Sequence, residues 1–442
     1  MRVISVDDLE VPTGELHLFL PTASGAQPSA IPPSFNQRYH VVASGATGGW
    51  LGVAFELTVA GAPDLAALQS AFAALVRRHE TLRTSFVRHD QVVRVIHEEP
   101  CAWHRQAIAI AGDAGQRLDQ VRSIIDAHTR PCEFPGYLLG ALLSAEGATV
   151  ITAFNHVHVD AVSLTIVVHD ILAAYRGEPL DRNPSSVSGW AEHAEGSVAS
   201  PDGVARWHRF LDAHLGLPRF PADLGVDLGA RAPQRVLVRA LLDREQATAA
   251  EDRCRAAGGR MVAGVLGACA RAAADATEQQ GLATILPVST RRDPRWARSL
   301  GWFVTNVPIE VPVCESVAES IAASQSALEA ALELRAVSTA EVLGTYPSPL
   351  NLDRDFFMVS YLDYRRVADA EELRAHNAQH FSASAPTGDV QVWFARTEQG
   401  LAVRVRLPDT PAADHAVACW LEDVQIELDS LSAKPEGLLP WK

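Results

Sequence analysis

Two apolar runs, followed by a short polar loop and an apolar helix, constrain this chain more than any other stretch of its sequence. Residues 138–143 and 149–154 flank a glycine-containing turn and predict a hairpin of buried strands. Residues 162–175 place apolar side chains at helical spacing, so a helix should follow. The loop between strand and helix carries His156 and Asp160. Loops held by regular elements commonly carry catalytic groups, so this loop is the candidate site.

His156 is the predicted catalytic base. A neutral imidazole has an ordinary pKa of about 6.5, which suits it to accept a proton from a hydroxyl or an amine. Asp160 fits two interpretations, a group close to the chemistry or the N-cap of the following helix. His158 is a rival base because it would share a face with His156 in an extended segment. These residues alone leave a purely structural histidine as the alternative.

Charge and cysteine spacing exclude several classes of protein. The chain is long enough for about two or three domains. Its formal charge of −15 and its lack of basic runs argue against nucleic acid as a partner. The six cysteines form no Cys-x-x-Cys pair and have no histidine at zinc-ligand spacing, so no metal site is predicted. We expect them to be reduced thiols buried in the core.

The ends and the hydropathy pattern point away from secretion and from a membrane. The N-terminal segment has acidic residues where a signal peptide needs a basic start and an uninterrupted apolar core. No apolar run reaches the roughly 20 residues that span a bilayer. We therefore expect a cytoplasmic protein without a membrane partner.

Helical and strand-like patterns mix in both halves of the chain, which predicts an α/β (mixed α+β) fold. Residues 183–204 lie in a stretch rich in Pro, Ser, Gly and Asn, typical of a segment that crosses between domains. The predicted N-terminal lobe, residues 1–182, carries the His156 loop. Residues 205–442 form the predicted C-terminal lobe.

Five stretches resemble motifs of condensation domains from nonribosomal peptide synthetases. Residues 78–86 (RHETLRTSF) match the family's RHExLRTxF motif at every fixed position, and residues 155–161 resemble its HHxxxDG motif. Residues 34–38 are similar to SxAQxR, and residues 300–308 to GxFVNTxPL. Residues 357–365 resemble a strand of the free-standing acyltransferases of this superfamily, which also holds chloramphenicol acetyltransferase and the polyketide-associated acyltransferases.

This resemblance implies two chloramphenicol-acetyltransferase-like lobes in a V, with the active site in a tunnel between them. It implies that His156 acts as base or orients the nucleophile. Asp160 would brace the loop through Arg291, with Arg292 as the alternative partner, and the amide at Ala161 would face the oxyanion. The further candidates near the site are His158, Ser163, Asn306 and Tyr361.

The implied reaction moves an acyl or aminoacyl group to the hydroxyl or amine of a small-molecule acceptor. The donor would be the phosphopantetheine thioester of an acyl or peptidyl carrier protein, and no cofactor would be bound. The setting would be nonribosomal peptide, antibiotic or other natural-product biosynthesis, carried out by a free-standing enzyme because the chain shows no adenylation or carrier segment. An acyl-CoA-dependent polyketide-associated acyltransferase is the alternative.

Two departures from the histidine motif leave a third interpretation open. Asn155 stands where the family has its first histidine, and an amide hydrogen-bonds but does not titrate. Ala161 stands where the family has glycine, and its Cβ disfavours the positive φ that glycine allows. A catalytically silent recruitment protein is therefore the alternative from another functional class.

Overall fold

The computed structural model describes residues 1–43, 49–58, 62–180, 184–195, 200–276, 280–348, 350 and 354–433. The chain divides into two compact units, each built from three segments. The first unit comprises Met1–Val198, Ser289–Thr305 and Arg366–Ser384. The second comprises Ala199–Val288, Asn306–Arg365 and Ala385–Lys442.

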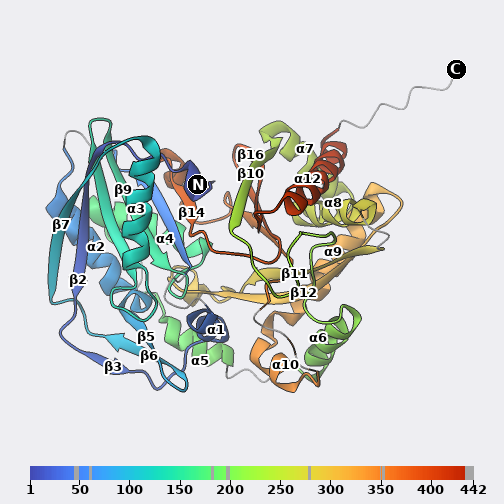
Figure 1. Cartoon of the computed structure of the whole chain (residues 1–442), viewed down its shortest axis with the longest axis horizontal. Coiled ribbons are helices and arrows are strands. Elements are labelled where there is room, and N and C mark those ends of the chain that lie inside the picture. The colour runs from blue at the N-terminus through green and yellow to red at the C-terminus, as the bar shows by residue number, and fades with distance from the viewer. Residues whose placement is uncertain are drawn as a thin grey trace. The chain divides into compact units, whose positions relative to one another are not determined.

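A seven-stranded sheet forms the centre of the first unit (Figure 1). Its strands, in spatial order, are β1 (Arg2–Val3), β14 (Gln379–Ser382), β4 (Trp50–Glu56), β9 (Gly147–Asn155), β8 (Tyr137–Ser144), β2 (Gly14–Thr22) and β7 (Ala102–Ile110). All neighbouring strands pair antiparallel except β1 and β14. The predicted hairpin is β8 and β9, and it lies inside the sheet, which explains why both strands are apolar.

Helices cover both faces of this sheet. Leu18 of β2 belongs to the apolar cluster that contains Val121 of α3 (Ala114–His128). The next residue, Phe19, points to the opposite face and contacts Phe72 of α2 (Leu65–Arg78), with ring centroids 5.0 Å apart. α4 (Ala161–Tyr175) packs beside α2 and is buried along most of its length. The buried position of α4 fixes where the His156 loop must end.

The remaining elements of the first unit surround this core. A small sheet contains β3 (Ala26–Pro28), β6 (Val92–His97) and β5 (Thr84–Arg88). The other helices are α1 (Phe35–Ala43), α5 (Val187–Glu195) and α11 (Ala370–Ala375), with short 3-10 turns η1 (Val6–Asp8), η2 (Glu80–Arg83) and η3 (Pro294–Trp296). Ser34 caps α1, because its hydroxyl accepts the Gln37 amide at 3.4 Å while the Gln37 side chain accepts the Ser34 amide at 3.1 Å.

The second unit is built on a six-stranded mixed sheet (Figure 1). Its spatial order is β10 (Gln234–Asp243), β16 (Gly400–Pro408), β15 (Gln391–Thr397), β13 (Met358–Asp363), β11 (Gly281–Ser289) and β12 (Val304–Pro312). Its helices are α6 (Pro201–Ala213), α7 (Arg244–Ala256), α8 (Met261–Ala276), α9 (Val317–Glu333), α10 (Thr339–Thr345) and α12 (Pro411–Ser432), with the turn η4 (Leu334–Ala336). α8 packs against α9 and α12. The predicted mixture of α and β structure is confirmed.

The segment boundaries differ from the sequence-based division at residues 183–204. Ser289–Thr305 and Arg366–Ser384 belong to the first unit, although the sequence analysis placed them in the C-terminal lobe. The reason is long-range pairing: β14 pairs with β4, and Arg291 binds Asp160. The predicted crossing also contains a regular element, α5. Local composition does not reveal such pairing, because it depends on residues far apart in sequence.

The expectation that all six cysteines are buried was wrong. Only Cys254 and Cys269 are buried, whereas Cys101, Cys132 and Cys419 are exposed and Cys314 is intermediate. All six are free thiols. The error came from inferring burial from residue type. Cys101 lies in a bend before β7, Cys132 in a turn and Cys419 on the exposed side of α12. Among the described residues, no helix combines the length and apolar character needed to cross a bilayer.

Candidate active site

The candidate loop joins the end of β9 to the start of α4. Asn155 pairs with Trp50 of β4, and the amide of His156 donates to the Gly49 carbonyl at 3.0 Å, so sheet pairing continues to His156 itself. At the other end, Asp160 caps α4 through the amide of Ser163 at 2.8 Å. Five residues, His156 to Asp160, therefore join a fixed strand to a fixed helix.

The His156 side chain is oriented by one backbone contact. Its Nδ1 lies 2.9 Å from the Val159 carbonyl oxygen. A carbonyl oxygen only accepts, so Nδ1 carries the proton and Nε2 keeps its lone pair. A base needs that free lone pair, and the ring is only partly buried.

The surroundings favour neutral His156. Burial lowers the pKa of this imidazole, and the contacts with backbone groups and the charge of Asp160 oppose that effect in part. Two rings adjoin it. Trp302 stacks on it with centroids 3.9 Å apart and an angle of 22°, and His40 lies 6.0 Å away. Burial lowers the pKa of His40 to about 3, so His40 is neutral too.

Asp160 braces the loop with both carboxylate oxygens. Oδ1 accepts from the Ser163 amide, the Ser163 hydroxyl and Arg291 Nη2, each at 2.8 Å. Oδ2 accepts the Phe303 amide at 3.0 Å. A carboxylate with this set of donors is committed to structure, as the resemblance implied.

Arg291 is the partner of Asp160, and Arg292 is not needed for that role. Both side chains of the pair are 5% exposed. Arg291 Nη1 donates to the carbonyls of Trp296 and Ser299, and its guanidinium lies 4.1 Å from the centre of the Phe303 ring. These contacts attach residues 291–303 to the loop.

Asn155 performs a structural task. Its Nδ2 donates to the Thr129 carbonyl at 2.9 Å, and its Oδ1 accepts the Val157 amide at 3.1 Å. The side chain is fully buried and bonded through both polar atoms to backbone groups. Loss of the family's first histidine therefore leaves the loop anchored.

Ala161 is the first residue of α4, directly after its N-cap. Amide groups in the first turn of a helix lack an intrahelical acceptor and lie at the positive end of the helix dipole. The motif's glycine position thus offers a backbone N–H that does not depend on its side chain.

His158 is not a second base. Its side chain is 0% exposed, and in the described part of the chain neither ring nitrogen has a hydrogen-bond partner. Its ring packs near Phe86 and Tyr137. Burial lowers its pKa to about 4, so it is a neutral core residue at neutral pH.

Two other motifs also contact the loop or residues 289–305. Gln37, from residues 34–38, donates to the Val157 carbonyl at 2.9 Å. His79, from residues 78–86, bonds Asp170 of α4 at 2.8 Å through Nε2 and accepts the Leu300 amide at Nδ1 at 3.4 Å. Arg78 also pairs with Asp170, at 2.9 Å. The charged end of α2 therefore fixes neighbouring segments of the first unit.

The other candidates are distributed between the units. Ser163 lies in the loop cluster, where its hydroxyl contacts Asp160, Arg291 and the Gly301 carbonyl. Asn306 and Tyr361 lie in the second unit, on β12 and β13. Tyr361 packs against the apolar core of that unit. Burial, with the charges of Asp363 and Glu251, raises its pKa.

Sequence reasoning missed Trp302 and His40. Trp302 lies inside the motif at residues 300–308, at a position where the family pattern fixes no residue. His40 follows the motif at residues 34–38 by two positions. Gly301, by contrast, is required there, because a Cβ would lie 2.6 Å from the Phe303 ring and 2.8 Å from Val187.

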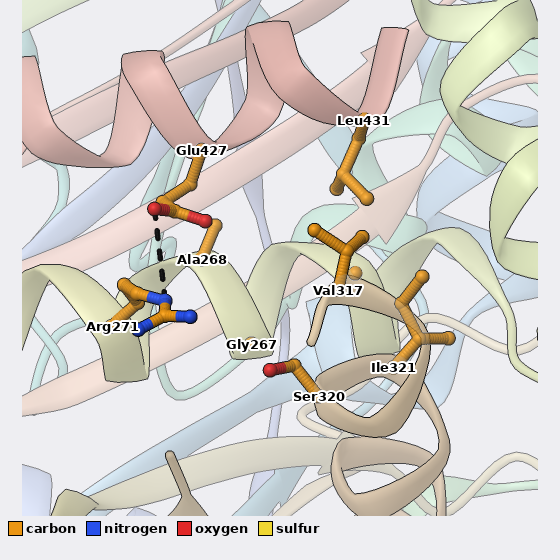
Figure 2. Close-up of a pocket in the computed structure, with 9 residues that line it drawn as sticks. Gly267, Ala268, Arg271, Val317, Ser320, Ile321, Glu427 and Leu431 are labelled. Carbon is orange, nitrogen blue, oxygen red and sulfur yellow. Dashed lines mark ion pairs between the residues drawn. The ribbon is translucent and has the colours of Figure 1, made fainter. Parts of the chain in front are cut away.

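A separate hollow in the second unit has a different character (Figure 2). It lies among α8, α9 and α12, and Arg271 and Glu427 pair across it at 3.7 Å. Its other lining residues are small or apolar apart from Ser320. Since the carboxylate in this lining is paired with Arg271 and the lining contains no histidine, the His156 loop is the candidate active site.

Comparison with known proteins identifies the family of the chain. Residues 37–385 match the family model described as Condensation domain. The chain is 28% identical over 378 residues to Acyltransferase PapA3 of Mycobacterium tuberculosis (strain ATCC 25618 / H37Rv), which covers 81% of this chain and 79% of that protein. It is 27% identical over 422 residues to Trehalose-2-sulfate acyltransferase PapA2 of the same strain, covering 89% and 88%.

Solved structures confirm the condensation-domain type of fold. A structure of PapA2 acyl transferase superposes with a TM-score of 0.84 at 22% identity, covering 98% of this chain and all (100%) of that one. The condensation domain of the Monacolin K polyketide synthase MokA gives 0.72 at 15% identity, covering 94% and 99%.

Proposed function

Because this chain belongs to the Condensation domain family and is an acyltransferase, we propose that it esterifies a hydroxyl of a small sugar-like acceptor. The acyl group comes from a phosphopantetheine thioester, and His156 Nε2 is the base. The observation that carries the proposal is the contact between His156 Nδ1 and the Val159 carbonyl, which leaves Nε2 unprotonated.

The reaction needs only this chain's own groups and two substrates. The acceptor hydroxyl gives its proton to Nε2 while its oxygen attacks the thioester carbonyl carbon. The amide N–H of Ala161, at the positive end of α4, is the proposed donor to the tetrahedral oxyanion. The C–S bond then breaks and the imidazolium returns the proton to sulfur, so an ester and a free thiol leave.

The relatives support a hydroxyl acceptor. PapA2 is named a trehalose-2-sulfate acyltransferase. Its similarity covers 89% of this chain and 88% of PapA2. A disaccharide offers hydroxyls and no amine, so ester formation is the favoured product. We therefore take trehalose and its 2-sulfate as the first acceptors to test.

The donor is proposed to be a carrier-protein thioester, with acyl-CoA as the alternative. Both present the same phosphopantetheine thioester to His156, so the loop geometry suits either. We also propose the setting inferred from the motifs, natural-product biosynthesis in the cytoplasm.

The test measures ester formation by mass spectrometry with the purified full-length chain. Palmitoyl-CoA and palmitoyl carrier protein are each offered with trehalose, trehalose-2-sulfate or an amino acid amide. We expect ester from a sugar with at least one donor, and a loss of about 10²- to 10⁴-fold in His156→Ala.

His158→Leu is the matched control, since it removes a histidine two residues away that makes no hydrogen bond through its ring among the described residues. It should keep its rate within a few-fold. Equal rates in wild type and His156→Ala would overturn the role of His156, and amide formation without ester would overturn the acceptor. No product with either donor would favour a silent recruitment protein or a different substrate.

A further inference from the structure

Trp302 covers one face of the His156 ring. The two ring centroids are 3.9 Å apart and the planes are inclined by 22°, which is a stacked contact. At this separation the imidazole has no room to rotate about its Cβ–Cγ bond, because the rotation would drive a ring edge into the indole. Any motion of the His156 ring out of its plane therefore requires Trp302 to move.

The backbone on both sides of Trp302 is held by the residues that brace the catalytic loop. The Gly301 amide donates to Ser163 Oγ at 3.2 Å, and the Phe303 amide donates to Asp160 Oδ2 at 3.0 Å. The Leu300 amide reaches His79 Nδ1 at 3.4 Å. The Asp160 brace therefore has a second effect, because it fixes the backbone that carries the indole.

We propose that Trp302 is a positioning residue that locks the His156 imidazole in the orientation that keeps Nδ1 on the Val159 carbonyl and Nε2 free. This inference rests on the proposed role of His156 as base. It assigns a task to Asp160 and Arg291 beyond holding the loop: they act on the base through Trp302.

His40 is the third ring in a cluster with His156 and Trp302, and it is neutral. Its ring lies 5.6 Å from Trp302 at 81°, an edge contact that supports the indole from the side. His40 and His158 are both neutral at neutral pH. Among the described residues, Asp160 is the charged side chain that acts on the pKa of His156, and Arg291 is bonded to it. Removal of Trp302 changes none of these charges, so its effect should come from ring orientation and solvent access.

The decisive measurement reads the tautomer of His156 without relying on turnover. Histidine side chains are labelled with ¹⁵N, and long-range ¹⁵N–¹H spectra identify His156 by the signals that disappear in His156→Gln. Wild type should show one tautomer, with the proton on Nδ1. Trp302→Leu should show a second tautomer or an averaged signal, whereas Trp302→Phe, which keeps an aromatic face, should resemble wild type.

Trp190→Phe is the matched control. The ring centroid of Trp190 lies 5.1 Å from that of Phe303, the residue after Trp302. Trp190 does not stack on His156, so its replacement should leave the His156 signals unchanged. If Trp302→Leu does not fold, Trp302→Met decides in the same way, because the flexible thioether fills more of the space left by the indole.

Kinetics give the second readout. In Trp302→Leu, kcat should fall by about ten- to a hundredfold, part of the 10²- to 10⁴-fold that a positioned base contributes, with KM nearly unchanged. A single Nδ1-protonated tautomer in Trp302→Leu would overturn the inference, and so would an unchanged kcat. Since the spectra need no substrate, a failure to find the donor or the acceptor would leave this result intact.

Discussion

Each unit contains a cluster of arginine and carboxylate side chains from distant parts of the chain, buried in the first unit and partly buried in the second. In the first unit, Arg291 Nη2 lies 2.8 Å from Asp160 Oδ1, and both side chains are 5% exposed. In the second, Arg365 bonds both Glu251 of α7 and Asp363 of β13, and Arg396 of β15 also reaches Glu251, at 3.2 Å. Arg365 is 22% and Glu251 16% exposed.

The two clusters differ in what they hold. The carboxylate of the first also binds the amide next to Trp302, whose indole stacks on a neutral, partly exposed imidazole. The second joins one helix to two strands, and the titratable ring beside it is Tyr361, whose pKa is raised by burial first and by Asp363 and Glu251 second. A buried ion pair thus indicates function only when it fixes a group able to exchange a proton near neutral pH.

The largest difference between the two clusters should appear when Arg291 or Arg365 is replaced by alanine. Arg291→Ala leaves Asp160 buried without its cation, which costs about 3–5 kcal/mol of folding free energy. It also releases the backbone around Trp302, so kcat should fall by at least about tenfold in the fraction that remains folded. Urea unfolding and kcat at a temperature well below the transition measure the two effects.

Arg365→Ala is the matched control. Its partners are less buried, and Arg396 still reaches Glu251, so the loss should be about 1–3 kcal/mol. The folded protein should keep its kcat within a few-fold. If Arg365→Ala lowers kcat as much as Arg291→Ala does, the distinction between a bracing and a merely structural cluster fails.

The pH dependence of kcat/KM should also distinguish the two clusters, through an effect smaller than that of replacing the arginines. Burial lowers the pKa of His156, so the base stays neutral as the pH falls to 6.5 and loses activity only below that value. Below this lowered pKa the rate should fall about tenfold per pH unit, because each step reduces the neutral fraction tenfold.

The same acid limb should appear in Arg365→Ala, measured under the same conditions. Arg365 pairs with Glu251 and Asp363, whereas the pKa of His156 is set by its own burial, its backbone contacts and Asp160. An acid limb at or above pH 6.5 in wild type would contradict the lowered pKa of the base. A limb that moves in Arg365→Ala would show that the second cluster is coupled to the site.

Sequence could predict the first cluster because its members lie in motifs of fixed order. Residues 155–161 and the arginine at 291 were paired by resemblance, and the structure joins Arg291 to Asp160 at 2.8 Å. The mixed α/β class followed from local periodicity. The sequence shows that Asn155 hydrogen-bonds but does not titrate, and the structure identifies its two backbone partners, the Thr129 carbonyl and the Val157 amide.

What the sequence could not supply depends on packing between distant segments. Trp302 and His40 are 262 positions apart, by their numbers in the sequence, and nothing in the pattern of either segment shows that their rings meet at 5.6 Å. The assignment of Ser289–Thr305 to the first unit has the same cause. Ring contacts and single hydrogen bonds leave no periodic trace, unlike the apolar faces of helices and strands.

Tyr361→Phe should have the smallest effect and completes the comparison. The sequence analysis named Tyr361 as a candidate near the site, but its ring packs against the apolar core of the second unit. Its raised pKa keeps the hydroxyl protonated at neutral pH, so it does not act as a base there. Removing one oxygen from a ring that keeps its packing should change kcat and KM by less than about threefold, with folding free energy altered by about 1 kcal/mol. Steady-state kinetics of Tyr361→Phe and His156→Ala, measured under the same conditions, compares the two losses of kcat.

A loss in Tyr361→Phe that approaches that of His156→Ala would mean that β13 contributes directly to the reaction. The second cluster, through Asp363, would then support an active-site residue.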